Sequence, residues 1–354
     1  MIQKFAKSSL VAIALLLNGC GGDNAHDGTG LGGASSSSQT GALASLQTNV
    51  MLFHANAFKG ALESLESQVA SAGMTDLTAL QNTFVTVVKE WKSVQATYVA
   101  ADYSSSMIDI PQFVDYFHTG KKLNVGDDIE NALNQSGDIS AALFKNSSKS
   151  INALEYLLYG TKNTSSRRTD ALKAVISNLK SKATTIASFY QSNTSFSSNE
   201  TDASNAIVNV LIDSTFKLKE WRIGEASGIA LKFKDNPDAS RLEYATSKLS
   251  LEGIKAIVKA HQDVMGERSY GNFGSFAAEH GAGTVVTQIR TQLNTILVTA
   301  NAFNVPLEDA IGTAIEDAKV KKLYNEVKAL QELYFTSLIQ ALNLTAEIIE
   351  ADGD

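Results

Sequence analysis

Hydrophobic residues between positions 77 and 98 recur every three or four residues, a spacing that places them along one face of a helix. The segments 46–69 and 320–338 show the same spacing. Gly73 and Asp76, which precede 77–98, fit a helix end followed by the N-cap of the next helix. Further helical patterns cover residues 147–159, 169–191, 202–231, 241–265, 275–300 and 307–316. No segment shows sustained strand-like alternation bounded by turn residues, so the sequence predicts an all-α fold.

The folded region, 42–354, is longer than the stretch that one four-helix core usually serves. We therefore expect two packed helical bundles of the up-down type, with 42–200 and 201–354 as the possible halves. The tripeptide Lys-Glu-Trp occurs at 89–91 and again at 219–221. Such short repeats leave open whether the second bundle arose by internal duplication.

Composition agrees with a helical fold and excludes several classes of protein. Only 3 of the 354 residues are proline, against a usual share of about 5%, and proline interrupts helices. A single cysteine rules out an internal disulfide. The net charge of -7 opposes binding to the phosphates of nucleic acids. The longest apolar run, 10–17, is far shorter than the roughly 20 residues of a membrane-spanning helix.

The N-terminus has the parts of an export signal. Two lysines precede the apolar run 10–17, and Leu-Asn-Gly-Cys follows at 17–20. These four residues resemble a bacterial lipobox, in which the signal is cut before the cysteine and the cysteine is lipidated. The alternative is an ordinary secretory signal that contains a cysteine by chance. The lipobox interpretation predicts a signal peptide over 1–19 and a lipid on Cys20 that makes the membrane a partner.

Residues 20–41 predict a flexible tether. Gly and Ser account for over half of 21–41, and so few apolar side chains cannot offset the entropy lost on ordering. Gly21 rather than an aspartate follows the cysteine, which in Gram-negative lipoproteins usually permits transfer to the outer membrane. We expect a protein of the bacterial cell envelope that is anchored to the outer membrane and faces the periplasm.

Residues 150–160 read Ser-Ile-Asn-Ala-Leu-Glu-Tyr-Leu-Leu-Tyr-Gly, and Glu155 is their one charged residue. Its neighbours are large and apolar, so we expect the carboxylate to be at least partly buried. A buried carboxylate needs a cation, a hydroxyl or a ligand, or else it is protonated. Three outcomes are open from the residues alone: an ion pair in the core with Arg222, Lys219 or Lys255, a ligand or metal role, or exposure to solvent.

The same run resembles the signature helix of the imelysin family, bacterial envelope proteins that carry G-x-H-x-x-E followed by Tyr-Leu-Leu and a glycine. Looser similarities lie at 90–102, 250–254, 306–311 and 352–354. The resemblance extends along most of the mature chain and implies an imelysin-like helical domain over 42–354. It also implies a connection with iron or other metal physiology.

Two positions depart from the family motif. Asn152 stands in place of the metal-site histidine, and Ser150 in place of the leading glycine. A His and a Glu at i and i+3 share a helix face and can reach one divalent cation, whereas an amide oxygen is a poorer ligand for zinc-like ions. Glu155, Asn152 and Arg222 are therefore candidate ligand-binding residues, and a metal pair is not assumed.

The histidines that remain show no H-x-x-x-H or H-E-x-x-H spacing, which favours capping or surface roles for His54, His118, His261 and His280. His261 lies near two acidic residues and could supply one metal ligand, so Glu155 and His261 are the candidate metal residues. The cofactor suggested by the resemblance is a divalent metal or iron. With Cys20 assigned to the lipid, no Ser-His-Asp or Cys-His arrangement can be argued, and no catalytic residue is proposed.

Two functions compete at this point. The first is a lipid-anchored binding or accessory protein without catalytic activity, with a small ligand or an envelope protein as its partner. The second is an imelysin-type metallopeptidase with a non-standard metal site, in which the missing histidine is replaced from elsewhere in space. A structural envelope protein is a third reading. We favour the first function, and the ligands that surround Glu155 discriminate between the first two.

Overall fold

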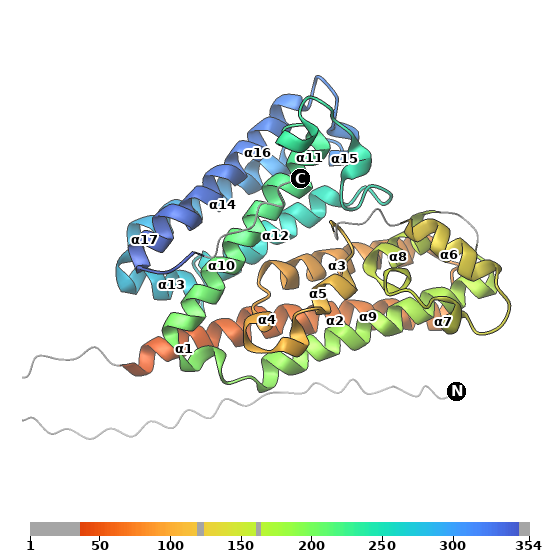
Figure 1. The fold of residues 1–354 in the computed structure, drawn as a ribbon, viewed down its shortest axis with the longest axis horizontal. Helices are drawn as coiled ribbons and strands as arrows, with labels where there is room; N and C mark the ends of the chain where they lie inside the picture. The colour runs from red at the N-terminus through yellow and green to blue at the C-terminus, as the bar shows by residue number, and fades with distance from the viewer. Residues whose placement is uncertain (1–35, 119–123, 161–163, 347–354) are drawn as a thin grey trace, which may run out of the picture. The chain divides into compact units, whose positions relative to one another are not determined.

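The computed structural model describes residues 36–118, 124–160 and 164–346, which form helices joined by turns and loops (Figure 1). These three ranges contain no β-strand, which confirms the predicted all-α fold. Within them, no helix is long and apolar enough to cross a membrane. The predicted signal peptide and Cys20 lie outside the described residues.

The first set of helices is built around three long ones, of which α2 packs against both α3 and α9. The π-helical turn η1 (Gln47–Leu52) joins α1 directly to α2. The α-helices of this set are α1 (Ser36–Leu46), α2 (Phe53–Ala72), α3 (Leu77–Ala96), α4 (Ala100–Tyr103), α5 (Ile110–Val114), α6 (Val125–Asn134), α7 (Ile139–Ala142), α8 (Ile151–Glu155) and α9 (Ser166–Ser192).

In the second set, α14 packs against both α12 and α16, and α10 packs against α16. The α-helices of this set are α10 (Glu200–Lys219), α11 (Glu225–Ser227), α12 (Ser250–Met265), α13 (Phe273–Ala277), α14 (Gly283–Asn301), α15 (Leu307–Ala310), α16 (Asp317–Glu332) and α17 (Ile339–Leu342). Further π-helical turns are η4 (Tyr156–Gly160), η6 (Glu220–Gly224), η9 (Ala278–Ala282) and η10 (Leu333–Leu338). Short 3-10 turns lie at Ser105–Met107, Ser147–Lys149, Phe196–Ser198, Leu231–Phe233 and Ala239–Arg241.

The hydrophobic stripe of α3 faces the core, as its spacing predicts. Phe84, Val87 and Trp91 are fully buried. The helix also begins where the sequence places its cap, because the side chain of Asp76 accepts a hydrogen bond from the N–H of Ala79 at 2.9 Å. Gly73 ends the preceding helix with a φ of 60°, a conformation that suits glycine.

Helix boundaries differ from the sequence prediction in four places. The helix predicted from 241 begins only at Ser250, because the preceding residues form a turn in which Lys248 has a φ of 60°. The helix predicted over 202–231 is interrupted by η6 and ends at Gly228, which has a φ of 72°. The helix predicted over 307–316 stops at Ala310, shortly before Gly312 with its φ of 77°. Helix α1 begins inside the segment predicted as tether, and it packs on α13.

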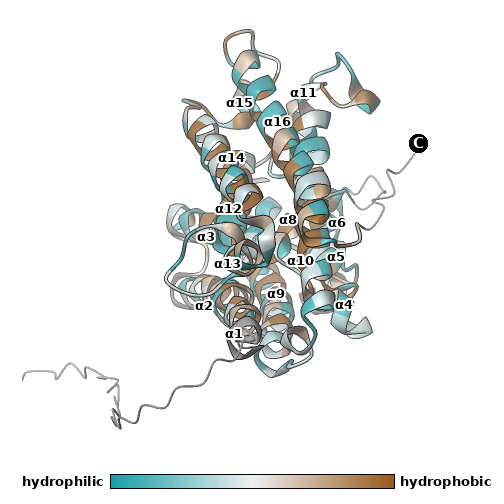
Figure 2. Cartoon of the chain, turned by 90° about the vertical axis from the view of Figure 1, so that its left-hand side faces the viewer, coloured by the Kyte–Doolittle hydropathy of each residue, from teal (hydrophilic) through white to brown (hydrophobic). Residues whose placement is uncertain are grey.

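Both sets of helices contribute to one continuous hydrophobic core, which extends from Leu43 to Leu338. Helix α3 of the first set packs on α12 of the second. Figure 2 shows the corresponding alternation of hydrophobic and hydrophilic colour along the helices. The described residues between 36 and 346 therefore group as one compact unit. The division into halves near residue 200 and the internal duplication stay predictions.

Candidate functional site

The signature segment begins with a helix cap and continues into the core. Ser150 is the N-cap of α8, and its hydroxyl accepts a hydrogen bond from the N–H of Ala153 at 3.4 Å. After Glu155 the helix widens into the π-helical turn η4, which ends at Gly160. Ile151, Leu154 and Leu158 are fully buried. The serine in place of the family glycine therefore starts the helix, and the apolar residues fix the helix in the core.

The glycine that ends the run makes room for an aromatic ring. A Cβ atom on Gly160 would lie 2.5 Å from Cδ2 of Tyr156, and one on Gly126 would lie 2.7 Å from Cε2 of the same ring. The Tyr156 hydroxyl donates a hydrogen bond to Glu130 at 3.0 Å, and the Arg168 guanidinium lies 5.4 Å from the ring centre. Two glycines thus allow Tyr156 to lie against the backbone beside Glu155.

Asn152 uses its side chain to hold a neighbouring segment of the chain. Its Oδ1 accepts the backbone N–H of Tyr116 at 2.9 Å. The Ser150 hydroxyl also lies 3.5 Å from this oxygen, so two protein groups contact the atom that stands at the position of the family's metal-site histidine. The side chain still lines a cavity, described below.

Glu155 is buried, as its surroundings predict, with 6% of its surface exposed. Its Oε1 accepts two hydrogen bonds from Ser247, one from the backbone N–H at 2.8 Å and one from the hydroxyl at 2.7 Å. Burial raises the pKa of Glu155 to about 7; the bonds from Ser247 oppose this rise, and the negative charges of Glu308 and Asp115 add to it. At neutral pH this carboxyl group is therefore close to half protonated.

The ion pair of Glu155 with a basic residue, one of the three outcomes that the sequence leaves open, does not form with any of the three candidates. Lys219 pairs with Glu220 at 2.9 Å, Lys255 pairs with Glu252, and Arg222 binds Glu243. Each of these cations forms an ion pair with another carboxylate. The hydrogen-bond donors to Glu155 come instead from Ser247, which lies in the loop before α12.

Arg222 belongs to a buried ion network that sequence reasoning missed. Its Nε donates to Glu243 Oε2 at 2.8 Å, and its Nη2 donates to Gln95 Oε1 at 2.8 Å. The ammonium of Lys92, fully buried on α3, binds Glu243, Gln95 at 2.9 Å and Asp115 at 2.6 Å. Burial would raise the pKa of Asp115, but Lys92 holds it below its usual value. Two cations and two carboxylates therefore balance one another here.

A cavity of about 540 Å³ opens beside this network. Glu155 and Asn152 line it, whereas Arg222 does not, so the cavity contains two of the three candidate ligand residues. Its remaining lining residues are Tyr116, Phe117, His118, Asn124, Val125, Gly126, Tyr156, Ser240, Arg241, Leu242 and Thr246. Residues of α6, of α8 and its continuation η4, of the loop between α5 and α6 and of the segment before α12 thus meet at one site.

His118 forms part of the cavity wall with a fixed orientation. Its ring stacks on Trp221 with 4.2 Å between ring centres and 3° between ring planes. Its Nε2 lies 2.8 Å from a carboxylate oxygen of Glu225. Stacking and hydrogen bonding together hold the ring, so the nitrogen that faces Glu225 is engaged.

His261 lies in the core of the second set of helices and does not line the cavity of Glu155. Its two ring nitrogens lie 3.3 Å from the Tyr334 hydroxyl and 3.0 Å from the Ser214 hydroxyl. Burial lowers the pKa of His261 to about 3, so the ring is neutral. The structure does not bring the two candidate metal residues, Glu155 and His261, together.

Surface or capping roles are also wrong for two histidines. His261 is buried, and so is His54, which lies 3.5 Å from Glu90 and 3.2 Å from Asp263. Burial alone would lower the pKa of His54, but the two carboxylates raise it above its usual value. His280 is partly exposed and lies 2.7 Å from the carbonyl oxygen of Phe276, consistent with a local helix contact.

The residues around Glu155 do not fit the metal site that the signature helix implies. A zinc-type catalytic site needs about three protein ligands. The side-chain oxygen of Asn152 accepts the N–H of Tyr116, and the ring of His118 is held by Trp221 and Glu225. Among the described residues no group of three or more His, Cys, Asp or Glu side chains is arranged to hold a metal ion.

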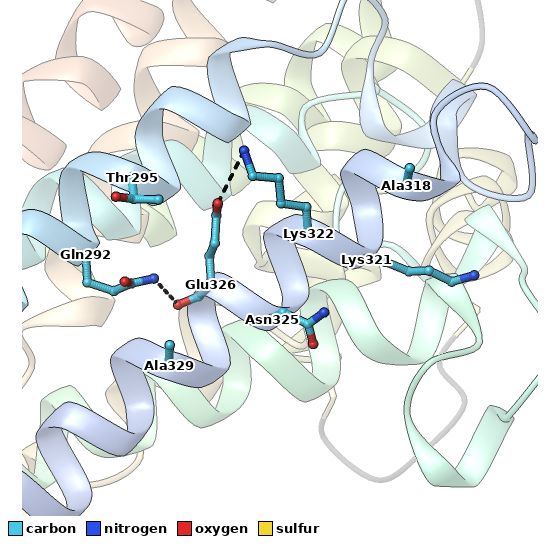
Figure 3. A pocket seen from close by; sticks show the side chains of 8 residues that line it. All are labelled: Gln292, Thr295, Ala318, Lys321, Lys322, Asn325, Glu326 and Ala329. Atoms are coloured by element: carbon cyan, nitrogen blue, oxygen red, sulfur yellow. Dashed lines mark hydrogen bonds and ion pairs between the residues drawn. The ribbon is translucent and has the colours of Figure 1, made fainter.

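A second hollow, of about 520 Å³, lies between α14 and α16 and contains none of the predicted site residues (Figure 3). Gln292 donates a hydrogen bond to the backbone oxygen of Glu326 at 2.8 Å, and Lys322 lies 3.6 Å from the Glu326 carboxylate. Oε1 of Glu326 also accepts a bond from Thr299 at 3.0 Å, and its Oε2 is buried without a partner in the described chain. Like Glu155, Glu326 therefore has one carboxylate oxygen that accepts hydrogen bonds and one that accepts none within the described residues.

Comparisons with known proteins agree with the fold. An imelysin-like protein from Psychrobacter arcticus 273-4 is similar in structure, with a TM-score of 0.73 and 16% identity over 89% of this chain and 98% of that one. A candidate iron-regulated protein A precursor from Parabacteroides distasonis ATCC 8503 has a TM-score of 0.58 and 14% identity over 86% of this chain and 97% of that one. No curated protein matches the sequence.

At such low identity the two structures establish a shared fold and nothing further. The sequence itself carries the assignment, since the family described as Imelysin matches residues 50–334, which is most of the chain. The chain therefore belongs to the imelysin family.

Proposed function

We propose that this protein is a lipid-anchored binding or accessory protein of the bacterial cell envelope, without peptidase activity. The anchor is Cys20, in a Leu-Asn-Gly-Cys sequence that follows an apolar run and precedes a segment rich in Gly and Ser. Gly21 favours the outer membrane, with the helical domain in the periplasm. The imelysin-like domain then binds its ligand in the cavity lined by Glu155 and Asn152.

The observation that carries this proposal is the use of the two motif side chains. Asn152 holds the backbone of Tyr116, and Glu155 accepts both donors of Ser247. A hydrolytic metal centre needs about three protein ligands and a bound water whose pKa the metal lowers to near 7. In this chain the motif pair instead builds the wall of a cavity, which supports binding rather than hydrolysis.

The link with iron or other metal physiology is supported by one structural neighbour. The Parabacteroides distasonis protein with this fold is named as a candidate iron-regulated protein A precursor. We propose that this chain acts in the same kind of setting. Its abundance in cells is then expected to change when an iron chelator is added to the medium, and equal abundance with and without the chelator would count against the link.

The test of the non-catalytic role is an assay with an unfolded protein substrate. The purified chain is incubated with added zinc, iron or manganese, beside Asn152→His and Glu155→Ala. We expect no cleavage by the unmodified chain with any of the metals. Cleavage that a chelator stops and that is lost in Glu155→Ala would show an imelysin-type metallopeptidase with a non-standard site and would overturn the proposal.

A further inference from the structure

Among the described residues, the buried charges around the cavity do not balance. Four buried carboxylates, on Asp115, Glu155, Glu243 and Glu308, lie in this part of the protein. Lys92 and Arg222 are the cations of the ion network, and they pair with Asp115 and Glu243. Glu155 and Glu308 receive hydrogen bonds only from Ser247 and Ser250 within the described residues. In the described part of the chain, these two buried carboxyl groups are thus left without a cation.

Both of these carboxyl groups have an unused oxygen. Oε1 of Glu308 accepts the N–H of Ser250 at 3.1 Å, and its Oε2 is buried with no partner in the described chain. Glu155 accepts its bonds through Oε1, and no hydrogen bond to its Oε2 occurs among the described residues. Glu155 is the one of the two that lines the cavity. A donor that enters the cavity can therefore reach a carboxylate that lacks a partner.

The two basic side chains that line the cavity, among the described residues, already have partners. His118 lies against Glu225. The guanidinium of Arg241 donates to the carbonyl oxygen of Asn236 at 2.6 Å and lies 3.6 Å from the Asp238 carboxylate. Neither group bonds Glu155, so neither has to be displaced by a ligand that binds this carboxylate.

The chemistry of the walls distinguishes an organic cation from a metal ion. A divalent metal needs several oxygen or nitrogen ligands, and here Glu155 alone offers an unused oxygen from the signature helix. Tyr116, Phe117 and Tyr156 contribute aromatic surface, and Val125 and Leu242 contribute apolar surface. These side chains suit the hydrocarbon or aromatic body of an organic molecule.

We propose that the cavity binds an organic cation whose ammonium group donates a hydrogen bond to Glu155 Oε2 and whose apolar body lies along Tyr116 and Phe117. This inference rests on the proposed binding function and names the class of ligand for the same cavity. The ammonium supplies the positive charge that no lysine or arginine among the described residues supplies to Glu155. The aromatic and apolar walls remove the remainder of the ligand from water.

Proton exchange offers a signature of this binding. The pKa of Glu155 is raised to about 7 by burial, so part of the protein carries a proton there at neutral pH. An ammonium ion stabilises the ionised carboxylate and expels that proton. Binding at pH 7 is therefore expected to release protons, and the affinity is expected to rise as the pH is raised from 6 toward 8.

The experiment uses three matched probes: hexylammonium, hexanol and hexanoate, which differ only in the charged or polar end. Isothermal titration calorimetry in buffers of different ionisation enthalpy measures affinity and proton release together. We expect hexylammonium to bind with release of protons, and hexanoate and hexanol to bind about tenfold more weakly or not at all. Glu155→Gln is expected to lower the affinity for hexylammonium by about tenfold or more and to abolish the proton release.

Glu326→Gln is the matched control, because Glu326 is also largely buried with one unused oxygen but lies in the separate hollow between α14 and α16 (Figure 3). It is expected to leave hexylammonium binding unchanged, and melting curves show whether both variants are folded. Should Glu155→Gln not fold, the pH dependence of binding to the unmodified chain decides the question without a variant.

Several outcomes would overturn the proposal that the ligand is an organic cation. These are equal binding of hexanoate or hexanol, hexylammonium binding that Glu155→Gln leaves unchanged, affinity independent of pH, or displacement of hexylammonium by Mn²⁺ or Zn²⁺ at equal concentration. The peptidase assay fails or succeeds separately. If the protein cleaves the substrate and also binds hexylammonium, the proposed non-catalytic function is wrong and the ligand class stands. If it neither cleaves the substrate nor binds hexylammonium, the ligand class is wrong and the non-catalytic function stands.

Discussion

The indole N–H of Trp91 donates a hydrogen bond to Oδ2 of Asp115 at 2.9 Å, and this oxygen also binds the Lys92 ammonium at 2.6 Å. Adjacent residues of α3 thus converge on one carboxylate oxygen. The backbone N–H of Phe117 binds the other oxygen at 3.0 Å. Asp115 therefore fixes the start of the segment that continues into the cavity wall at Tyr116 and Phe117.

Removing the cation from this network is expected to be costly. Lys92→Met leaves Asp115 buried without a cation and Glu243 paired with Arg222 alone. We expect it to lower the free energy of unfolding by about 3–5 kcal/mol. The control is Lys89→Met, whose ammonium is partly exposed beside Glu252 and for which about 0–1 kcal/mol is expected. Urea denaturation measures both values. Equal losses in the two variants would mean that the buried network does not contribute to stability.

A methyl group at Gly160 is expected to disturb the signature segment. Its Cβ would lie 2.5 Å from the Tyr156 ring, so Gly160→Ala should cost about 1–3 kcal/mol of stability through overpacking. Tyr156→Leu should relieve most of this cost in the double variant. Gly60→Ala on α2 is the control, because nothing lies within 4 Å of its Cβ position, and it should gain about 0.5–1 kcal/mol. Similar denaturation midpoints for the two alanine variants would contradict the packing argument.

Glu155 is expected to make stability depend on pH. In the unfolded chain its carboxyl group loses the proton near its ordinary pKa of 4.5, whereas the folded protein keeps the proton up to about pH 7. Between these values the folded state binds more protons, so stability falls as the pH rises, by about 3 kcal/mol in all. Outside this interval Glu155 adds no slope.

The measurement for this effect compares unfolding free energies of the unmodified chain and Glu155→Gln from pH 4.5 to pH 8. The difference between the two isolates Glu155 from the other titrating groups. We expect that difference to change steadily between pH 4.5 and 7 and to level off above. A difference that stays constant over the whole range would refute a raised pKa at this residue.

The lipid anchor is tested in cells. If Cys20 is lipidated, the unmodified protein should sediment with membranes, and Cys20→Ser should be released as a soluble or unprocessed form. Density-gradient separation of the two membranes then shows whether the protein is anchored to the inner or the outer membrane. Identical partitioning of the two proteins would remove the lipobox interpretation and leave an ordinary secretory signal.

Local sequence patterns predicted the long helices well. The stripe on α3, the cap at Asp76 and the helix end at Gly73 all occur as their residues predict. These features depend on side chains within a few residues of one another, which is why they can be read from one segment. The late start of α12 was not predictable in this way, because the preceding turn contains apolar residues, such as the buried Tyr244, that also fit a helix.

The site was predictable only in part. The burial of Glu155 followed from its apolar neighbours, but its partner Ser247 is 92 residues away and lies on a loop. Lys92 offered one overlooked signal, since it follows the buried Val88 by four residues and so lies on the inner face of α3. Glu243 offered none, because its position in the core is set by the packing of α12 on α3.

The ion network also determines how the protein unfolds. Lys92 belongs to α3 and Glu243 to the loop before α12, so separating the two sets of helices would leave buried charges unpaired on both sides. The hydrophobic core continues across the same contact. Neither set can therefore melt by itself at low cost, and the domain is expected to unfold in a single cooperative transition. A fragment that ends near residue 200 would retain Lys92 and Asp115 but lack Glu243, and so would not reproduce half of the intact domain.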